Sequence, residues 1–238
     1  MIGSLLFAAG RGERLRPLSD RVPKAAVPVA GVPLGAFALS ALAAVRPPVV
    51  VNTSHLAEMV RHALEPFAGA ADAEFTVERP HALGTAGTLR ALSARVEDTL
   101  LTMNADLLTD LDLRTLLSAH RDSGTPATLA VKRVNTGADL DVAGTRAVEL
   151  IDRRRDPGRQ GFLYLGAAVF EPSALRLLGG RGPRGLAEAL LRPLIARREA
   201  AVFVHTGYAL DVGTPERLER AHRDIAAGLG PALPRPRR

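Results

Sequence analysis

The stretch that decides the fold is Leu6–Val29, LFAAGRGERLRPLSDRVPKAAVPV, near the start of a 238-residue chain. An apolar run, predicted to be the strand Ile2–Ala8, ends just before Gly10 and Gly12. Prolines at positions 17, 23, 28 and 33 forbid an α-helix until about Leu34. The stretch is therefore predicted to be a long structured loop leaving the carboxyl end of a strand, where open α/β sheets bind ligands.

Along the rest of the chain, apolar runs alternate with helical patterns. The other predicted strands are Pro48–Asn52, Ala73–Glu78, Thr99–Met103, Ala127–Val134, Phe162–Phe170 and Ala200–His205. The clearest helix is Leu56–Glu65, with Met59 on its apolar face, Ser54 as its N-cap and Pro66 as its end, and the last helix begins at the cap Thr214 followed by Pro215. Asp110 and Asp112 are interpreted as acids at a helix N-terminus, and Pro193 is expected to kink or split the helix Leu186–Arg198. This alternation predicts an α/β fold with a doubly wound, mostly parallel, Rossmann-like sheet in a three-layer sandwich. We expect one domain over residues 1–228 and a disordered basic tail over 229–238.

Composition excludes several classes of protein. Because the chain has no cysteine, it has no disulfides or thiolate metal sites, which fits a cytoplasmic protein. The chain has no apolar run long enough for a transmembrane helix, so we expect no membrane partner, and its N-terminus is interpreted as a strand, not a signal peptide. The formal charge is +6, but apart from Lys24 and Lys132 the basic residues are arginines, mostly scattered, with only seven Phe and two Tyr beside them. We therefore expect no nucleic-acid partner.

The loop itself suits phosphate binding. Glycines let backbone N–H groups approach phosphate oxygens, and Arg11, Arg14 and Lys24 supply countercharge. The P-loop pattern GxxxxGK[ST] is absent, and the dinucleotide pattern lacks its third glycine. An ordinary Gly/Pro turn with surface arginines is the alternative.

The pattern G-x-G-x-R-x-x-P-[LT]-[TS]-x-x-x-P-K-x-x-x-P, here GRGERLRPLSDRVPKAAVP, resembles the signature of the sugar-1-phosphate nucleotidyltransferases, whose fold is GT-A-like. The resemblance implies that Ala9, Gly10, Arg11 and Gly12 bind the NTP phosphates. It further implies that Arg14 stabilises the pentavalent α-phosphate and the departing pyrophosphate. By the same resemblance, Lys24 contacts the sugar phosphate and the α-phosphate.

Three later motifs agree with this resemblance. The segment Leu83–Gly87, LGTAG, resembles the one that lines the family's nucleobase pocket and comprises Leu83, Gly84, Thr85, Ala86 and Gly87. By resemblance, Asp106 in Asn104-Ala105-Asp106 and Asp211 in Asp211-Val212-Gly213-Thr214-Pro215 bind Mg²⁺. Asn104 and Gly166 are the candidates for contact with the sugar phosphate. Two departures stand out: Leu210 where an aromatic is frequent, and Asp152–Pro157 in place of the family's Glu-Lys-Pro.

The predicted reaction joins a sugar 1-phosphate to the nucleoside monophosphate of an NTP and releases pyrophosphate, with Mg²⁺ as cofactor. GTP with a manno-configured sugar is preferred, and UTP, as in an N-acetylmuramate-1-phosphate uridylyltransferase, is the alternative. Phosphocholine or a molybdenum cofactor as acceptor is disfavoured, since a choline cage needs aromatic rings and the chain has no Trp. A non-catalytic nucleotide-sugar-binding subunit and a homo-oligomer are further possibilities.

Overall fold

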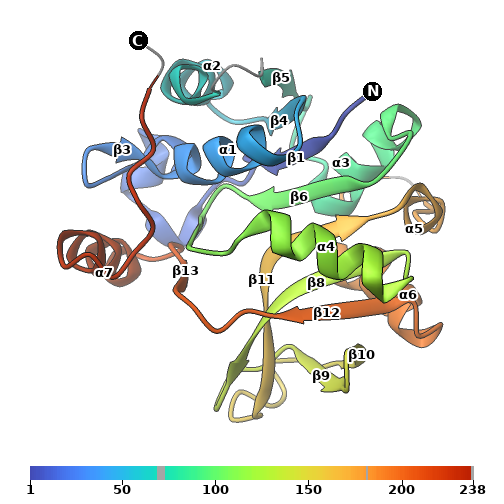
Figure 1. The fold of residues 1–238 in the computed structure, drawn as a ribbon. Coiled ribbons are helices and arrows are strands. Elements are labelled where there is room, and N and C mark those ends of the chain that lie inside the picture. The colour runs from blue at the N-terminus through green and yellow to red at the C-terminus, as the bar shows by residue number, and fades with distance from the viewer. Residues whose placement is uncertain (69–72, 181, 237–238) are drawn as a thin grey trace. The chain divides into compact units, whose positions relative to one another are not determined.

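The computed structural model describes residues 1–68, 73–180 and 182–236, arranged in two compact units (Figure 1). The first unit contains Met1–Ala82, Thr102–Leu111 and Gly207–Arg238, and the second contains Leu83–Leu101 and Asp112–Thr206. Each unit is described separately below.

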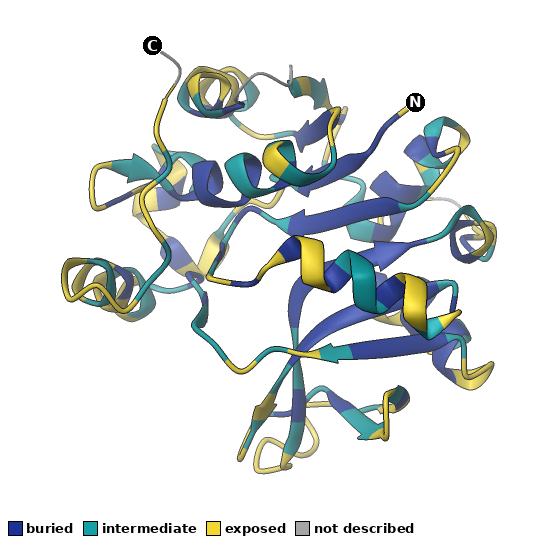
Figure 2. Cartoon of the chain, viewed as in Figure 1, coloured by how far each residue is buried: buried dark blue, intermediate teal, exposed yellow. Residues whose placement is uncertain are grey.

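The first unit is built on parallel βαβ crossovers. Its main strands are β1 (Ser4–Phe7), β4 (Val49–Thr53), β5 (Ala73–Val77) and β6 (Leu100–Asn104, which begins in the second unit). They are ordered β5-β4-β1-β6, and both β1–β4 and β4–β5 are parallel. Every residue of β4 is buried (Figure 2), as expected for a strand inside a parallel sheet. The strands predicted from apolar runs in this unit are confirmed to within two residues at either end.

The first unit contains further elements, most of them short. They are η1 (Glu13–Leu15), η2 (Leu18–Asp20), η3 (Lys24–Ala26), β2 (Pro28–Val29), β3 (Val32–Pro33), α1 (Leu34–Val45), α2 (Ala57–Leu64), η4 (Glu65–Phe67), β7 (Leu107–Thr109), β13 (Ala209–Asp211) and α7 (Pro215–Ala226). The loop contains only single 3₁₀ turns, and the first α-helix begins at Leu34, as the prolines predicted.

Two expectations for helix α2 are wrong. Its N-cap is Leu56, in the left-handed region with φ 53°, whereas the Ser54 hydroxyl donates instead to the carbonyl of Glu78 at 3.2 Å. Met59 was expected on the buried face, but it is 41% exposed and borders a cavity. The helix thus starts two residues later than a Ser54 cap would place it. The Ser54 hydroxyl is not available as a cap, because it donates to the carbonyl of Glu78, the residue after β5.

The second unit combines a parallel pair with antiparallel strands. Its strands are β8 (Ala127–Val134), β9 (Leu140–Ala143), β10 (Arg146–Leu150), β11 (Gly161–Phe170) and β12 (Ala200–Val204), ordered β11-β8-β12-β10-β9. Strands β8 and β12 are parallel, whereas β8–β11, β10–β12 and β9–β10 are antiparallel. The mostly parallel character that the sequence predicted therefore belongs to the first unit.

Helices of the second unit are α3 (Gly84–Leu92), η5 (Ser93–Arg95), α4 (Leu113–Ser123), α5 (Pro172–Leu175), the π-helical turn η6 (Ala187–Leu191) and α6 (Arg192–Ala196). Asp112 caps α4 by accepting from the N–H of Arg114 at 2.9 Å, which confirms its expected role as a helix N-terminal acid. Pro193 lies in the first turn of α6, where the π-helical turn gives way to α-helix. The predicted interruption by this proline is confirmed.

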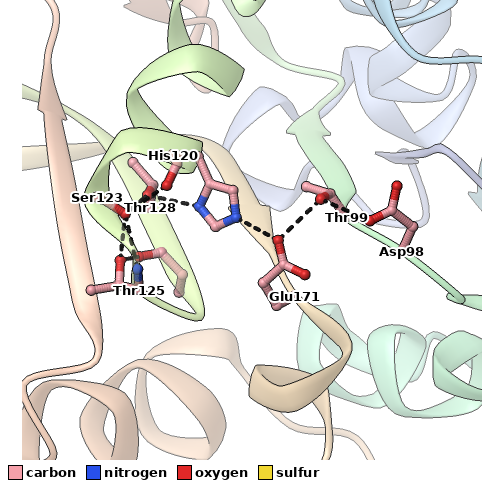
Figure 3. A network of polar contacts seen from close by, with 8 residues as sticks. Asp98, Thr99, His120, Ser123, Thr125, Thr128 and Glu171 are labelled. Atoms are coloured by element: carbon pink, nitrogen blue, oxygen red, sulfur yellow. Dashed lines mark hydrogen bonds and ion pairs between the residues drawn. The ribbon is translucent and has the colours of Figure 1, made fainter.

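A buried polar network joins α4 to two strands of the second unit (Figure 3). His120 is 3% exposed, and its ring nitrogens contact the Thr128 hydroxyl and a carboxylate oxygen of Glu171, both at 2.9 Å. The same Glu171 oxygen accepts from the Thr99 hydroxyl at 3.0 Å. The network fixes the end of α4 against the start of β8 and the residue after β11.

Two further findings concern the surface. Among the described residues, none of the helices has both the length and the apolar character needed to span a bilayer. Residues 229–236 contain no helix or strand, and Leu229 and Leu233 are exposed. The predicted disorder of the tail stays a prediction, and Arg237 and Arg238 lie outside the described residues.

Candidate active site

The loop after β1 is folded back on itself through Gly12. Gly12 has φ 65°, and a Cβ on it would lie 3.1 Å from the Cβ of Lys24. The Ser19 hydroxyl donates to the Gly12 carbonyl at 2.8 Å. Gly12 therefore suits both the left-handed turn and the close approach of Lys24, whereas Gly10 is exposed and nothing crowds it.

Two aspartates are brought together by the small antiparallel pair β7–β13. Asp106 directly precedes β7 and Asp211 is the last residue of β13, paired with Leu107. The N–H of Val212 donates to the Asp106 carbonyl at 2.9 Å, which ties the two backbones together. Leu210, the middle residue of β13, is buried in an apolar cluster with Phe37 and Ala221, so it anchors β13 in the core.

Lys24 lies between the two carboxylates. Its ammonium donates to Asp106 Oδ2 and lies 3.8 Å from Asp211 Oδ1. The Lys24 side chain is only 12% exposed. Three segments far apart in the sequence thus bring the predicted lysine and both predicted aspartates into one cluster.

Two arginines complete the cluster on the far oxygen of Asp211. Arg14 lies 3.6 Å from Asp211 Oδ2, and Arg217 donates to the same oxygen at 2.9 Å. A Cβ at Gly213 would lie 2.6 Å from an Arg14 guanidinium nitrogen, so this glycine leaves the space that Arg14 occupies. Sequence reasoning missed Arg217, although a basic residue six positions after Asp211, in the first turn of α7, was a readable signal.

The two carboxylates fit a divalent cation. Asp211 Oδ1 is the buried side-chain atom without a hydrogen-bond partner in the described part of the chain. No group of three or more His, Cys, Asp or Glu side chains able to hold a metal occurs within residues 1–68, 73–180 and 182–236. Mg²⁺ commonly takes one or two carboxylates and completes its shell with water and substrate phosphates, so two aspartates suffice.

A cavity of about 380 Å³ lies beside the glycine loop after β1 in the first unit. It is lined by Arg11, by residues 54–59 and by residues 77–82. Its walls carry side chains that sequence reasoning did not single out, among them His55, Glu58, Arg79 and His81. Their charges and ring nitrogens give this cavity hydrogen-bonding groups for a polar ligand.

The predicted nucleobase segment belongs to the second unit, where it begins helix α3. Gly84 has φ 71°, and a Cβ on it would lie 2.5 Å from the Arg184 carbonyl oxygen. That carbonyl accepts from the N–H of Ala86 at 3.1 Å, and the Arg184 N–H donates to Leu83 at 3.0 Å. The small residues here allow this backbone packing, and contact of Leu83–Gly87 with a base stays a prediction.

The predicted sugar end, Gly166, is a buried residue of β11 with φ 83°, near a register shift between Tyr164 and Ala168. Close by in the sequence, Tyr164 donates its N–H to the Asp139 carboxylate at 2.8 Å. Burial raises the pKa of the Asp139 carboxyl to about 6. The sequence analysis did not single out Asp139 as a buried acid of this region. Asn104, the other candidate, ends β6 and is partly buried.

The sequence and the structure of this chain resemble those of known proteins. A model of the family described as "Nucleotidyl transferase" matches residues 4–141, more than half of the chain. The chain belongs to this nucleotidyltransferase family. The matched region contains the glycine loop, Lys24 and Asp106 of the first unit, whereas Asp211 lies after it in the sequence.

Several relatives are similar over most of the chain. A mannose-1-phosphate guanylyltransferase of Mycobacterium tuberculosis is 27% identical over 97% of this chain and 66% of its own length. An N-acetylmuramate α-1-phosphate uridylyltransferase of Neisseria meningitidis is 29% identical over 92% of this chain and 96% of its own length. The chain thus spans slightly less than two thirds of the mycobacterial relative and almost the whole of the neisserial one.

Solved structures confirm the predicted fold class. A putative glucose-1-phosphate thymidylyltransferase from Bacillus anthracis matches with TM-score 0.80 at 17% identity, covering 98% of each chain. HddC from Yersinia pseudotuberculosis, in complex with GMP-PN, matches with TM-score 0.78 at 19% identity, covering 94% of this chain and 100% of the other. These structures confirm the predicted α/β fold, and the family model confirms the predicted nucleotidyltransferase family.

Proposed function

We propose that this chain transfers a nucleoside monophosphate from an NTP to a sugar 1-phosphate, releases pyrophosphate and uses Mg²⁺. The observation that carries the proposal is the cluster of Arg14, Lys24, Asp106 and Asp211 beside the glycine loop. In it, two carboxylates suited to a hard cation lie among cations suited to phosphates. Membership of the nucleotidyltransferase family supports the same chemistry.

The reaction is an in-line displacement in which the site residues orient the phosphates and neutralise their charge. An oxygen of the sugar phosphate attacks the α-phosphorus, and the bond from that phosphorus to pyrophosphate breaks as the new one forms. The attacking oxygen is already an anion, so no general base is required. Arg14 and Lys24 stabilise charge that builds up on the transferred and leaving phosphates, and backbone N–H groups of Ala9–Gly12 orient them. Bound Mg²⁺, held by Asp106 and Asp211, would neutralise phosphate charge.

We assign GTP as the preferred nucleotide and a manno-configured sugar 1-phosphate as the acceptor. The similarity to the mycobacterial mannose-1-phosphate guanylyltransferase over 97% of this chain supports this choice. UTP with N-acetylmuramate 1-phosphate is the second candidate. It is favoured by the neisserial uridylyltransferase, which this chain matches over 96% of that protein's length.

A pyrophosphate-release assay tests both choices. GTP, UTP, ATP, CTP and dTTP are each combined with mannose, glucose and N-acetylmuramate 1-phosphates. We expect kcat/KM for GTP with mannose 1-phosphate to exceed the others by about tenfold, which equals about 1.4 kcal/mol of transition-state binding. The same margin for UTP with N-acetylmuramate 1-phosphate would establish the second candidate instead, and no pyrophosphate from any pair would contradict the reaction.

The metal site is tested separately. Asp106→Asn and Asp211→Asn should each lower kcat by about a hundredfold or more while the circular-dichroism spectrum stays unchanged. Isothermal titration with Mg²⁺ and a non-hydrolysable NTP analogue should show weaker metal binding for both variants. Full activity in excess EDTA would contradict the two-aspartate metal site.

A further inference from the structure

The start of the proposed phosphate-binding loop is held by a single residue of the neighbouring strand. Strand β1 ends at Phe7, and the N–H of Ala8 faces Asn52 of β4. It is 3.2 Å from the Asn52 carbonyl oxygen and 2.9 Å from the Asn52 side-chain oxygen. The first residue of the loop is therefore fixed by both the backbone and the side chain of Asn52.

The side chain of Asn52 is itself fixed by Glu78. The Asn52 amide donates to Glu78 Oε1 at 2.9 Å, and the two residues are 3% and 9% exposed. Glu78 follows β5, where its N–H donates to the Thr53 carbonyl at 2.8 Å and its carbonyl accepts from Ser54. A chain of hydrogen bonds thus runs across the ends of β5, β4 and β1.

The same strand end is tied to the proposed metal ligands. The N–H of Ala105 donates to the Phe7 carbonyl at 3.0 Å. Ala105 lies between the candidate sugar-phosphate residue Asn104 and the candidate metal ligand Asp106. Phe7 and Ala8 are therefore the junction between the glycine loop and the first carboxylate, and a shift at Ala8 alters both.

The chemistry of this chain of hydrogen bonds requires an amide at position 52. Its oxygen must accept, because Ala8 offers an N–H, and its nitrogen must then donate to the Glu78 carboxylate. An aspartate there could accept from Ala8, but it would face Glu78 as a second carboxyl group. One of the two would have to carry a proton for a hydrogen bond to form.

We infer that Asn52, oriented by Glu78, is a positioning residue that sets the backbone of Ala8–Gly12 for the NTP phosphates. The inference rests on the proposed function of that loop. Transfer rates fall steeply when groups are misplaced by about 1 Å, so loss of the Asn52 side chain should reduce turnover without any change in a substrate-contacting residue.

The decisive variant is Asn52→Ala, because Asn52 does not border the 380 Å³ cavity whereas Glu78 does. Its matched control is Thr53→Val. Thr53 is the next residue of the same strand, is 1% exposed, and its hydroxyl donates to the Thr76 carbonyl at 2.8 Å. Asn52→Ala removes two buried side-chain hydrogen bonds and Thr53→Val removes one, but only the first change acts on Ala8.

We expect Asn52→Ala to lower kcat/KM for the NTP by about tenfold or more. Thr53→Val should also lower the thermal stability but keep wild-type kinetics. Glu78→Gln retains an oxygen that accepts from Asn52, so it should preserve most of the activity. For Asn52→Asp, kcat/KM relative to wild type should rise as pH is lowered, since one proton restores the bond to Glu78.

Hydrogen–deuterium exchange gives a readout that needs no turnover: residues 8–12 should exchange faster in Asn52→Ala than in wild type or Thr53→Val. Wild-type kinetics and exchange in Asn52→Ala, at a Tm lowered as in Thr53→Val, would overturn the positioning role alone. A wild-type protein that releases no pyrophosphate from any NTP would overturn the proposed function, and the role of Asn52 with it.

Discussion

At the scale of single residues, the most informative contacts are those around Asp211. One of its oxygens contacts Arg14 and Arg217, while the other is buried, lies 3.8 Å from the Lys24 ammonium and lacks a hydrogen bond among the described residues. A buried carboxylate oxygen without a donor is costly unless a cation or a ligand completes it. The positions of the arginines thus leave one oxygen of Asp211 for a cation.

Gly213→Ala tests the space beside Arg14. The new Cβ would lie 2.6 Å from an Arg14 guanidinium nitrogen, the far end of an exposed, flexible side chain, and 3.0 Å from Asp211 Oδ1. We expect Arg14 to move aside, so that the free energy of unfolding changes by about 0.5 kcal/mol or less, while kcat falls by about tenfold. Gly158→Ala, at an exposed position with nothing within 4 Å, is the control and should leave both unchanged. Wild-type kcat in Gly213→Ala would contradict the role of Arg14.

Asp139 gives a prediction about pH. Burial raises the pKa of its carboxyl from 3.8 to about 6, so the folded state favours the protonated form. The protonated carboxyl is neutral and can be buried without a charge, so this contribution of Asp139 to stability is fully present below the unfolded pKa of 3.8. It is lost as pH rises through about 6, because the carboxyl must then be buried as a charged group. Asp139→Asn still accepts from the Tyr164 N–H, and should therefore gain stability over wild type at about pH 8 but not at about pH 4, by on the order of 1–3 kcal/mol. Urea unfolding at both pH values measures this, and an equal difference at both would contradict it.

At the scale of elements, the sequence predicted seven strands well, because buried strands of a βαβ fold are short apolar runs between turn signals, but it did not identify β9 and β10. It also predicted the caps at Asp112 and Thr214, whose side chains accept from backbone N–H groups of their helices. The cap at Ser54 failed because Ser54 bonds Glu78, a residue 24 positions away. Local patterns reveal local bonds, and this bond is set by the neighbouring strand.

His120 is a buried residue of α4 that links this helix to β8 and to Glu171, so its replacement should destabilise the second unit. His120→Leu leaves Thr128 and Glu171 without their ring partner, so we expect a loss of about 1–3 kcal/mol in the free energy of unfolding. His62, exposed on α2, provides the control: His62→Leu should change stability by about 0.5 kcal/mol or less. Equal unfolding midpoints for the two variants in urea would show that the network contributes no stability.

At the scale of the whole molecule, the candidate site was predictable where the chain carries a dense motif. Lys24, Arg14, Asp106 and Asp211 were all named from the sequence, and the structure brings these four together in the first unit. Arg217, Asn52 and Glu78 were not found, because each acts on a residue brought close only by strand pairing or by the first turn of α7. Roles that depend on a neighbouring strand have no spacing signature in one sequence.

Charge is the remaining whole-molecule property. The chain has a formal charge of +6. In the candidate site, the lysine and the arginines are already paired with aspartates. Residues 229–238 carry three arginines and no acid, so their removal lowers the charge from +6 to +3. Binding to duplex DNA through such charges would be non-specific and would weaken steeply with salt.

Deleting residues 229–238 tests both the charge and the predicted tail. No helix or strand occurs in the described residues 229–236, so the Tm and kcat should stay unchanged. Duplex DNA should bind the full chain only weakly, in the non-specific range of about 10⁻⁴–10⁻⁶ M at physiological salt, and the shortened chain more weakly still. Fluorescence anisotropy with two unrelated duplexes measures this, with a salt titration to count the ions released. Nanomolar binding, or preference for one duplex, would mean that the arginines form a nucleic-acid surface. A fall in Tm on deletion would mean that the segment packs on the domain, so that the boundary at residue 228 is misplaced.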